Sequence, residues 1–197
     1  MTPARALAAD PPWQFGDALP GEGRGAVKHY ACLPVSEIAR FPLPELAADS
    51  FLFLWYVTAM TEEARFVARA WGFEPTGAEL TWVKTTRKPD GQPAPIVLDP
   101  MAPEAEAYAA RGARLTFGMG RTLRNCDERC LIARRGRPKV ASRSVRSVFF
   151  APAGDHSAKP DRFYELVEQL VGGGPYVELF ARRQRLGDWS CHGDQLA

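Results

Sequence analysis

The feature that most constrains the fold is an unbroken run of apolar and aromatic residues from Phe51 to Val57. A strand covered on only one face alternates apolar and polar residues, whereas a strand buried on both faces is apolar throughout. The run therefore predicts a central strand of a sheet that helices cover on both faces. A membrane span needs roughly 18 apolar residues, and no stretch of the chain approaches that length.

Shorter strand and helix signals alternate along the rest of the chain. Strands are predicted at residues 4–9, 80–84, 128–133, 147–150, 176–180 and 188–191. Helices are predicted at 36–39 with Ser36 as N-cap, at 61–71 with Phe66, Val67 and Ala70 on one face, and at 162–171. The alternation predicts an α/β fold, a mostly parallel sheet with helices on both faces. We expect a single domain over residues 1–197, with mobile loops at about 16–31 and 87–114.

The charge of the chain is distributed unevenly. The formal net charge is only +2, but the stretch from Arg111 to Arg146 holds eleven basic residues against two acids, Asp127 and Glu128. Such an excess can contact phosphates, although it is equally typical of a solvated surface. The residues predicted to contact a nucleic-acid backbone are Arg134, Arg135 and Arg137.

No segment indicates secretion, membrane insertion or a metal site. The N-terminus has no long apolar run before a cleavage site, so we expect a cytoplasmic protein that makes no contact with a membrane. Cys126 and Cys130 are four residues apart and Cys191 precedes His192. This spacing is unusual for zinc, and no metal is predicted.

The tetrapeptide Asp10-Pro11-Pro12-Trp13 follows the first predicted strand. A carboxylate and a backbone carbonyl fixed by proline can accept the two hydrogens of an amine, which helps its nitrogen to become tetrahedral and nucleophilic. A neighbouring aromatic ring offers a face on which a base can stack. The tetrapeptide therefore suits methylation of an adenine amine, with all four residues in the catalytic group. A proline turn that follows a strand and buries a tryptophan is the alternative that these residues alone leave open.

Eight short blocks, spread over nearly the whole chain, carry a family resemblance. They are Ala9-Asp10-Pro11-Pro12-Trp13, Lys28-His29-Tyr30 with Val35-Ser36-Glu37-Ile38, Leu52-Phe53-Leu54-Trp55, Trp82-Val83-Lys84-Thr85, Gly118-Met119-Gly120 with Leu123-Arg124-Asn125, His156-Ser157-Ala158-Lys159-Pro160-Asp161, Glu178-Leu179-Phe180-Ala181-Arg182 and Gly193-Asp194-Gln195-Leu196. In this order they resemble the adenine-N6 methyltransferase family that includes the catalytic subunit of the eukaryotic messenger-RNA adenosine methyltransferase, with bacterial and phage relatives. The resemblance implies a Rossmann-like fold with permuted motif order and S-adenosylmethionine as cofactor.

The resemblance also implies roles for single residues. Lys159 matches a lysine that meets the carboxylate of the cofactor, and Asp194 stands where the family has an asparagine, which removes donors and adds charge. The residues implied to bind the cofactor are Asp10, Lys159, Glu178, Phe180, Arg182, Asp194 and Gln195. The residues implied to border the acceptor are Trp13, Trp82, Lys84, Arg124 and Asn125. Trp82 fits the core equally well, and Glu178 fits a structural ion pair.

The implied substrate is an adenine in nucleic acid, DNA more than RNA, either single-stranded or flipped out of a duplex. Because only nine residues precede Asp10 and no separate recognition domain is identified, target choice is expected to come from the two loops or from a partner. A homodimer stays open, and a bacterial or phage origin is expected. The alternatives are a non-catalytic partner subunit that binds nucleic acid, and a methyltransferase that acts on a small-molecule nucleobase.

Overall fold

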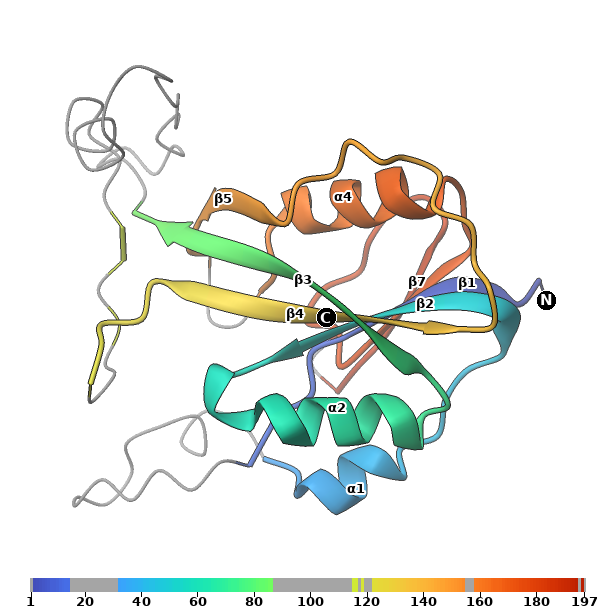
Figure 1. Ribbon diagram of the computed structural model, residues 1–197, viewed down its shortest axis with the longest axis horizontal. Helices are drawn as coiled ribbons and strands as arrows, with labels where there is room; N and C mark the ends of the chain where they lie inside the picture. Colours follow the sequence, from blue (N-terminus) through green and yellow to red (C-terminus); the bar gives the residue numbers. More distant parts are fainter. Residues whose placement is uncertain are drawn as a thin grey trace.

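Seven strands form one sheet in the order β5-β3-β4-β2-β1-β6-β7 (Figure 1). The computed structural model describes residues 2–14, 32–86, 115–116, 118, 122–154, 158–194 and 196. The strands are β1 (Ala4–Ala9), β2 (Leu46–Tyr56), β3 (Glu74–Thr85), β4 (Asp127–Arg135), β5 (Val148–Pro152), β6 (Tyr176–Leu179) and β7 (Trp189–His192). The helices are α1 (Val35–Ala39), the 3-10 turn η2 (Thr58–Met60), α2 (Thr61–Ala70) and α4 (Asp161–Val171).

The direction of the strands decides where a ligand can bind. Four of the six strand pairings are parallel, and only β4 runs against its two neighbours, β2 and β3. Six strands run in the same direction and finish at one end of the sheet, where β4 begins. We call this end the carboxyl end, and we call the other end of the sheet the opposite end. In open α/β sheets, ligands bind at the carboxyl end. The predicted mostly parallel α/β sheet is confirmed.

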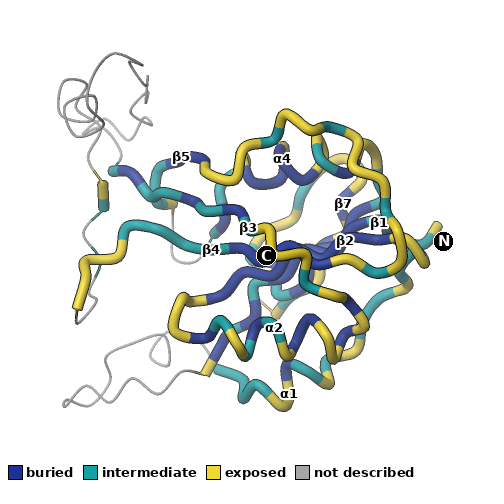
Figure 2. Tube along the Cα trace, viewed as in Figure 1, coloured by how far each residue is buried: buried dark blue, intermediate teal, exposed yellow. Residues whose placement is uncertain are grey.

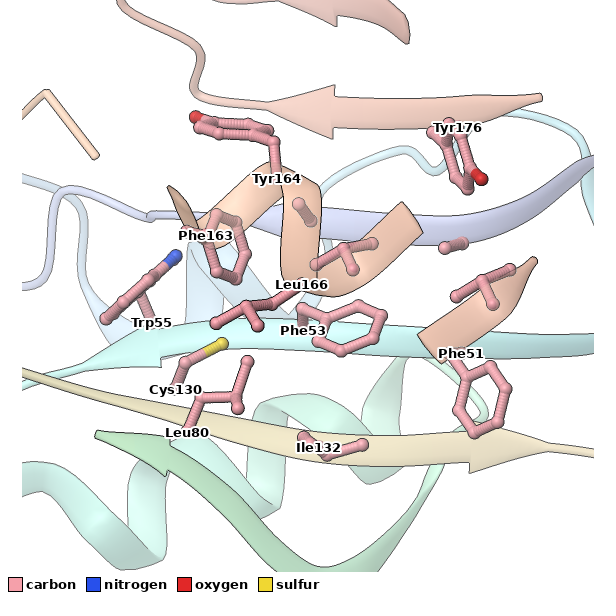
Figure 3. Packing of buried hydrophobic residues seen from close by; sticks show 14 of the residues in the cluster. Phe51, Phe53, Trp55, Leu80, Cys130, Ile132, Phe163, Tyr164, Leu166 and Tyr176 are labelled. Atoms are coloured by element: carbon pink, nitrogen blue, oxygen red, sulfur yellow. The ribbon is translucent and has the colours of Figure 1, made fainter. Parts of the chain in front are cut away.

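Strand β2 explains why helices lie on both faces of the sheet. Phe53 and Trp55 pack against Phe163 of α4, whereas Leu52 and Leu54 point to the other face, which α1 and α2 cover. Figure 3 shows the α4 side of this core, with Phe53 and Trp55 below the helix. Each large apolar side chain buried in this way contributes about 1.5–3 kcal/mol. The continuous apolar run therefore reflects a strand buried on both faces, as the sequence predicted.

Two details of the predicted helices are wrong. In α2 the buried side chains are Ala64, Val67 and Ala68, while Phe66 is 55% exposed and Ala70 is exposed as well. The buried stripe follows i, i+3 and i+4 from Ala64, and Phe66 falls outside that spacing. Helix α1 begins at Val35 after Pro34, so Ser36 already lies inside the first turn and makes no capping hydrogen bond.

The ends of the longer helices follow the sequence. Gly72 after α2 and Gly172 after α4 have positive φ angles of 79° and 72°, which glycine adopts without strain. The helices turn buried sides to the sheet and exposed sides outward (Figure 2). None of the helices in the described ranges is long and apolar enough to cross a membrane. The loops predicted at 16–31 and 87–114 lie outside the described residues.

Candidate active site

The Asp10-Pro11-Pro12-Trp13 turn lies at the carboxyl end of β1, as predicted. The Trp13 amide donates to the Pro11 carbonyl at 2.8 Å, and the Leu33 amide donates to the Pro12 carbonyl at 2.8 Å. Both carbonyls are therefore fixed in direction. A carbonyl oxygen has two lone pairs, so each retains one acceptor position for a further donor.

Trp13 anchors this turn to the sheet. Its side chain is only 5% exposed, and its indole Nε1 donates to the Trp55 carbonyl of β2 at 2.9 Å. A base needs an open ring face for stacking. The predicted stacking role is therefore replaced by a structural one, because this ring belongs to the core that also contains Ile38 and Leu54.

Four charged side chains form a chain of ion pairs beside the turn. The Lys159 ammonium lies 2.6 Å from Asp10 Oδ2 and 3.0 Å from Glu128 Oε2, and Lys84 pairs with the other oxygen of Glu128. Lys159 is 6% exposed and Asp10 is 19% exposed. Lys159 also lies 5.1 Å over the Trp55 ring. Two ammonium groups and two carboxylates balance one another, which is the condition for charges to persist away from water.

The pKa values of these groups follow from burial and from their neighbours. Burial favours the neutral form of Glu128, but the charges of Lys159 and Lys84 outweigh it and lower the Glu128 pKa to about 2. Burial and the charge of Glu128 raise the pKa of Asp10, against the opposing effect of Lys159. Burial alone would lower the pKa of Lys159, but the adjacent carboxylates of Asp10 and Glu128 raise it, so Lys159 stays protonated.

A narrow pocket opens next to the Asp10–Lys159 pair. Its lining residues are Asp10, Ala158, Lys159, Tyr164, Glu178, Phe180, Arg182 and Arg183. Glu178 of β6 is buried and accepts a hydrogen bond from the Tyr164 hydroxyl at 2.6 Å. Burial raises the Glu178 pKa, because the hydrogen bond from Tyr164 and the charge of Arg185 compensate only in part. Glu178 therefore lines this pocket and also lies 3.8 Å from Arg185, the structural ion pair that the sequence left open, while its role toward a cofactor stays a prediction.

The chain leaves β6 through a strained turn at this pocket. Phe180 has a φ of 60°, which is rare for a residue with a side chain and often marks a functional site. Its ring packs 4.6 Å from the ring of Phe41. Beyond it, a Cβ on Gly193 would lie 2.2 Å from the Ala181 carbonyl, so only glycine lets the chain after β7 approach here. Arg182 is half-buried, and its positive charge acts on Asp10.

Other predicted residues lie away from this pocket. Trp82 is a core residue whose indole donates to the Ala151 carbonyl at 3.0 Å. Arg124, Asn125 and Asp194 are exposed and do not line the pocket. Gln195 lies outside the described residues.

The predicted phosphate contacts lie at the far end of the molecule from Asp10. In the antiparallel register, Arg134 pairs with Phe51 and Arg135 with Ser50, at the opposite end of the sheet. Arg137 follows them, and its amide donates to the Asp49 carboxylate at 2.7 Å. These arginines therefore do not border Asp10, and their predicted contacts with a nucleic-acid backbone stay a prediction.

Sequence reasoning missed Glu128 as a site residue. It was counted only as one of two acids in a basic stretch, because a strand start does not show in which direction the strand runs. Since β4 is antiparallel, its first residues meet Lys84 and Lys159 at the carboxyl end. A lone glutamate among eleven basic residues, in a strand that enters the core, is the signal that could have indicated it.

Comparisons with known proteins show the family of this chain. The profile of the MT-A70 family matches residues 5–96 and 109–195. The human N(6)-adenosine-methyltransferase catalytic subunit METTL3 is 30% identical over 96% of this chain and 28% of its own length. The Arabidopsis thaliana N(6)-adenosine-methyltransferase MT-A70-like is 28% identical over 96% and 23%, and the human N(6)-adenine-specific methyltransferase METTL4 is 28% identical over 96% and 37%. The chain thus spans about a quarter to a third of these eukaryotic relatives, and it belongs to the MT-A70 family.

Proposed function

We propose that this protein transfers a methyl group from S-adenosylmethionine to the exocyclic amine of an adenine in nucleic acid. The observation that carries the proposal is the Asp10 carboxylate, held 2.6 Å from Lys159 beside the fixed carbonyls of Pro11 and Pro12. The names of the two human relatives, an adenosine and an adenine methyltransferase, support the same reaction.

The pocket beside Asp10 offers the groups that this cofactor requires. Lys159 is a buried cation suited to a carboxylate, Glu178 is an acceptor suited to hydroxyls, and Phe180 offers an aromatic ring. The pocket volume is about 10 Å³, which admits roughly one water molecule. Binding therefore requires the side chains on the outer wall to move. Arg183, which is about half exposed, would have to give up its hydrogen bonds to Asp161 at 2.6 Å and to the Lys159 carbonyl at 3.2 Å.

The residues of the turn would prepare the amine. Asp10 Oδ2 accepts from Lys159, which leaves Oδ1 for one amine hydrogen, and a proline carbonyl accepts the other. When bound, S-adenosylmethionine supplies a methyl group on a positively charged sulfur and departs as a neutral thioether. The Asp10 carboxylate would stabilise the positive charge that develops on the nitrogen until one amine proton passes to solvent water, which leaves the neutral methylamine.

The acceptor would reach Asp10 only as an unpaired base. An adenine inside a duplex is stacked, and flipping it out costs a few kcal/mol, so single-stranded or weakly paired substrates are expected to react best. The sequence favoured DNA over RNA on a bacterial and phage resemblance, while the relatives named above are eukaryotic. DNA and a bacterial or phage origin therefore stay predictions.

One experiment separates the proposal from its alternatives. The protein is incubated with methyl-labelled S-adenosylmethionine and, in parallel, with single-stranded DNA, single-stranded RNA, duplex DNA and free adenosine. Label on N6-methyladenine in any polymer supports the proposal, and the ratio between polymers identifies the substrate. Label on adenosine alone identifies a small-molecule enzyme. If the protein binds nucleic acid but no substrate becomes labelled, the protein is a partner subunit, whether or not it also binds the cofactor.

A further inference from the structure

A second concave site lies at the opposite end of the sheet from Asp10. It has a volume of about 470 Å³ and lies between the end of α2, the start of β3 and the end of β4. Its lining residues are Arg69, Gly72, Phe73, Glu74, Arg134, Arg135 and Gly136. We call it the arginine pocket. The proposed reaction uses none of these residues.

One arginine of this pocket is fixed in place before any ligand arrives. Arg135 Nη2 donates to the Trp71 carbonyl at 2.6 Å, and its guanidinium lies 4.6 Å from the centre of the Phe73 ring. A Cβ on Gly72 would lie 3.2 Å from Arg135 Nη2, so the glycine makes room for the guanidinium. The hydrogen bond also covers a terminal carbonyl of α2 that would otherwise repel an anion. A guanidinium has five N–H groups, so Arg135 retains donors for a ligand.

The pocket carries more positive than negative charge. Arg69 lies 3.7 Å from Glu74, and both side chains are mostly exposed, so this pair is weak. Arg134 is exposed at the mouth of the pocket. Three arginines therefore line the pocket with one carboxylate, and a second carboxylate, Asp49, lies beside Gly136 and accepts from the Arg137 amide. Planar guanidinium groups suit the oxygens of a phosphate better than a point charge does.

We infer that the arginine pocket binds a backbone phosphate of the nucleic acid whose adenine lies at Asp10. The inference rests on the proposed function and adds a length requirement to it. Strand β4 has nine residues between the two ends of the sheet, which corresponds to roughly 25–30 Å at about 3.3 Å per residue. With about 3.4 Å per stacked nucleotide, a strand must extend about eight nucleotides from the target adenine to reach the pocket.

The test compares two substrates with two variants. The substrates are fluorescent single strands of DNA and RNA with one central adenine, in lengths of about 6 and about 20 nucleotides. Only the longer strand can extend from Asp10 to the arginine pocket. The pocket variant is Arg69→Ala with Arg134→Ala. The control variant is Arg143→Ala with Arg146→Ala, which removes the same charge from two other exposed arginines.

We expect the pocket variant to bind the longer strand about three- to tenfold more weakly than the parent, with a salt slope flatter by roughly 0.7 per lost phosphate contact. Binding and methylation of the shorter strand should match the parent, and the control variant should match the parent on both. These results would support the phosphate site.

Three results would overturn the phosphate site. The first is an equal loss of affinity in both double variants, which means that only net charge matters. The others are an equal loss of affinity for both strand lengths, or an unchanged affinity of the pocket variant for the longer strand. A polyglutamate peptide that binds the parent more tightly than the longer strand does, and loses affinity only in the pocket variant, would reassign the pocket to an acidic protein. Failure of the proposed function is a separate result, because it appears as unmethylated short strand with the parent, whereas the binding series tests the pocket alone.

Discussion

The two ends of the sheet carry opposite kinds of charge arrangement. At the carboxyl end, Asp10, Glu128, Lys84 and Lys159 are buried or half-buried and balance one another. At the opposite end, three arginines line the pocket with the Glu74 carboxylate, and Asp49 lies beside them; Arg69 and Arg134 are exposed and Arg135 is half-buried. Charges removed from water must be paired, whereas exposed charges need no partner. The neutral end is therefore suited to positioning reacting groups, and the cationic end to attracting an anion.

Both arrangements depend on the direction of one strand. Because β4 is antiparallel, its acidic start, Glu128, joins the lysines at the carboxyl end, and its basic finish, Arg134 and Arg135, lies at the other. A parallel β4 would exchange the two groups. Substitutions that alter one end of the sheet and leave the other unchanged test this contrast between the two ends.

The largest effect is expected from Asp10→Ala. Loss of one positioned acceptor should lower the turnover of methyl transfer by about 10²–10⁴, while cofactor affinity stays close to that of the parent. Initial rates at saturating labelled cofactor measure the turnover, and calorimetry measures the affinity for the cofactor. Glu62→Ala is the control, because it removes an exposed carboxylate of α2 that makes only a surface ion pair. Full methylation by folded Asp10→Ala protein would contradict the assignment of Asp10.

The next effect concerns the cofactor. Arg182→Ala should weaken S-adenosylmethionine binding roughly 10- to 100-fold, the value of one charge-assisted hydrogen bond. Lys159→Ala should do the same and also destabilise the fold by about 3–5 kcal/mol, because it leaves the Asp10 carboxylate without its cation and Glu128 with Lys84 alone. Calorimetry and thermal unfolding measure both. Arg162→Ala, which removes only a surface pair with Glu165, is the control. Unchanged affinity in both variants would place the cofactor elsewhere.

A smaller effect concerns pH. The folded pKa of Glu128, about 2, lies below its ordinary value of 4.5. The unfolded chain therefore binds more protons between these values, and this contribution to stability is lost as the pH falls through that range. Glu128→Gln should cost on the order of 2 kcal/mol at neutral pH, with a cost that disappears near a pH of about 2.

Denaturant unfolding of the parent and of Glu128→Gln across that pH range measures this difference. Asp10, whose pKa burial raises, acts in the opposite sense in both proteins. Its effect is smaller in Glu128→Gln, because the Glu128 charge is one cause of that rise, so the two unfolding curves are compared over the whole pH range. Glu62→Gln, at an exposed position, should show no pH-dependent difference. A cost of Glu128→Gln that is constant with pH would show that the ion pairs with the two lysines do not cause it.

The sequence predicted those features that depend on local pattern. The end of β1 at Asp10, the buried run of β2 and the glycine that ends each longer helix are confirmed. The burial of Trp13 and Trp82 could not be predicted, because an indole in the core and an indole in a base-binding site have the same local sequence. The separation of Arg134 from Asp10 depends on long-range strand pairing, which no local pattern shows.

The smallest effect is expected from Arg135→Lys at the opposite end of the sheet. Lysine keeps the charge but loses the planar group that both donates to the Trp71 carbonyl and lies on the Phe73 ring. We expect a loss of about 1 kcal/mol, a fall in Tm of roughly 2–4 °C, and turnover on short single-stranded substrates equal to that of the parent. Calorimetric unfolding and initial rates measure both, with Arg143→Lys as the exposed control. A variant that loses turnover while keeping its Tm would show that the two ends are coupled, and the contrast between a catalytic and an attracting end would then fail.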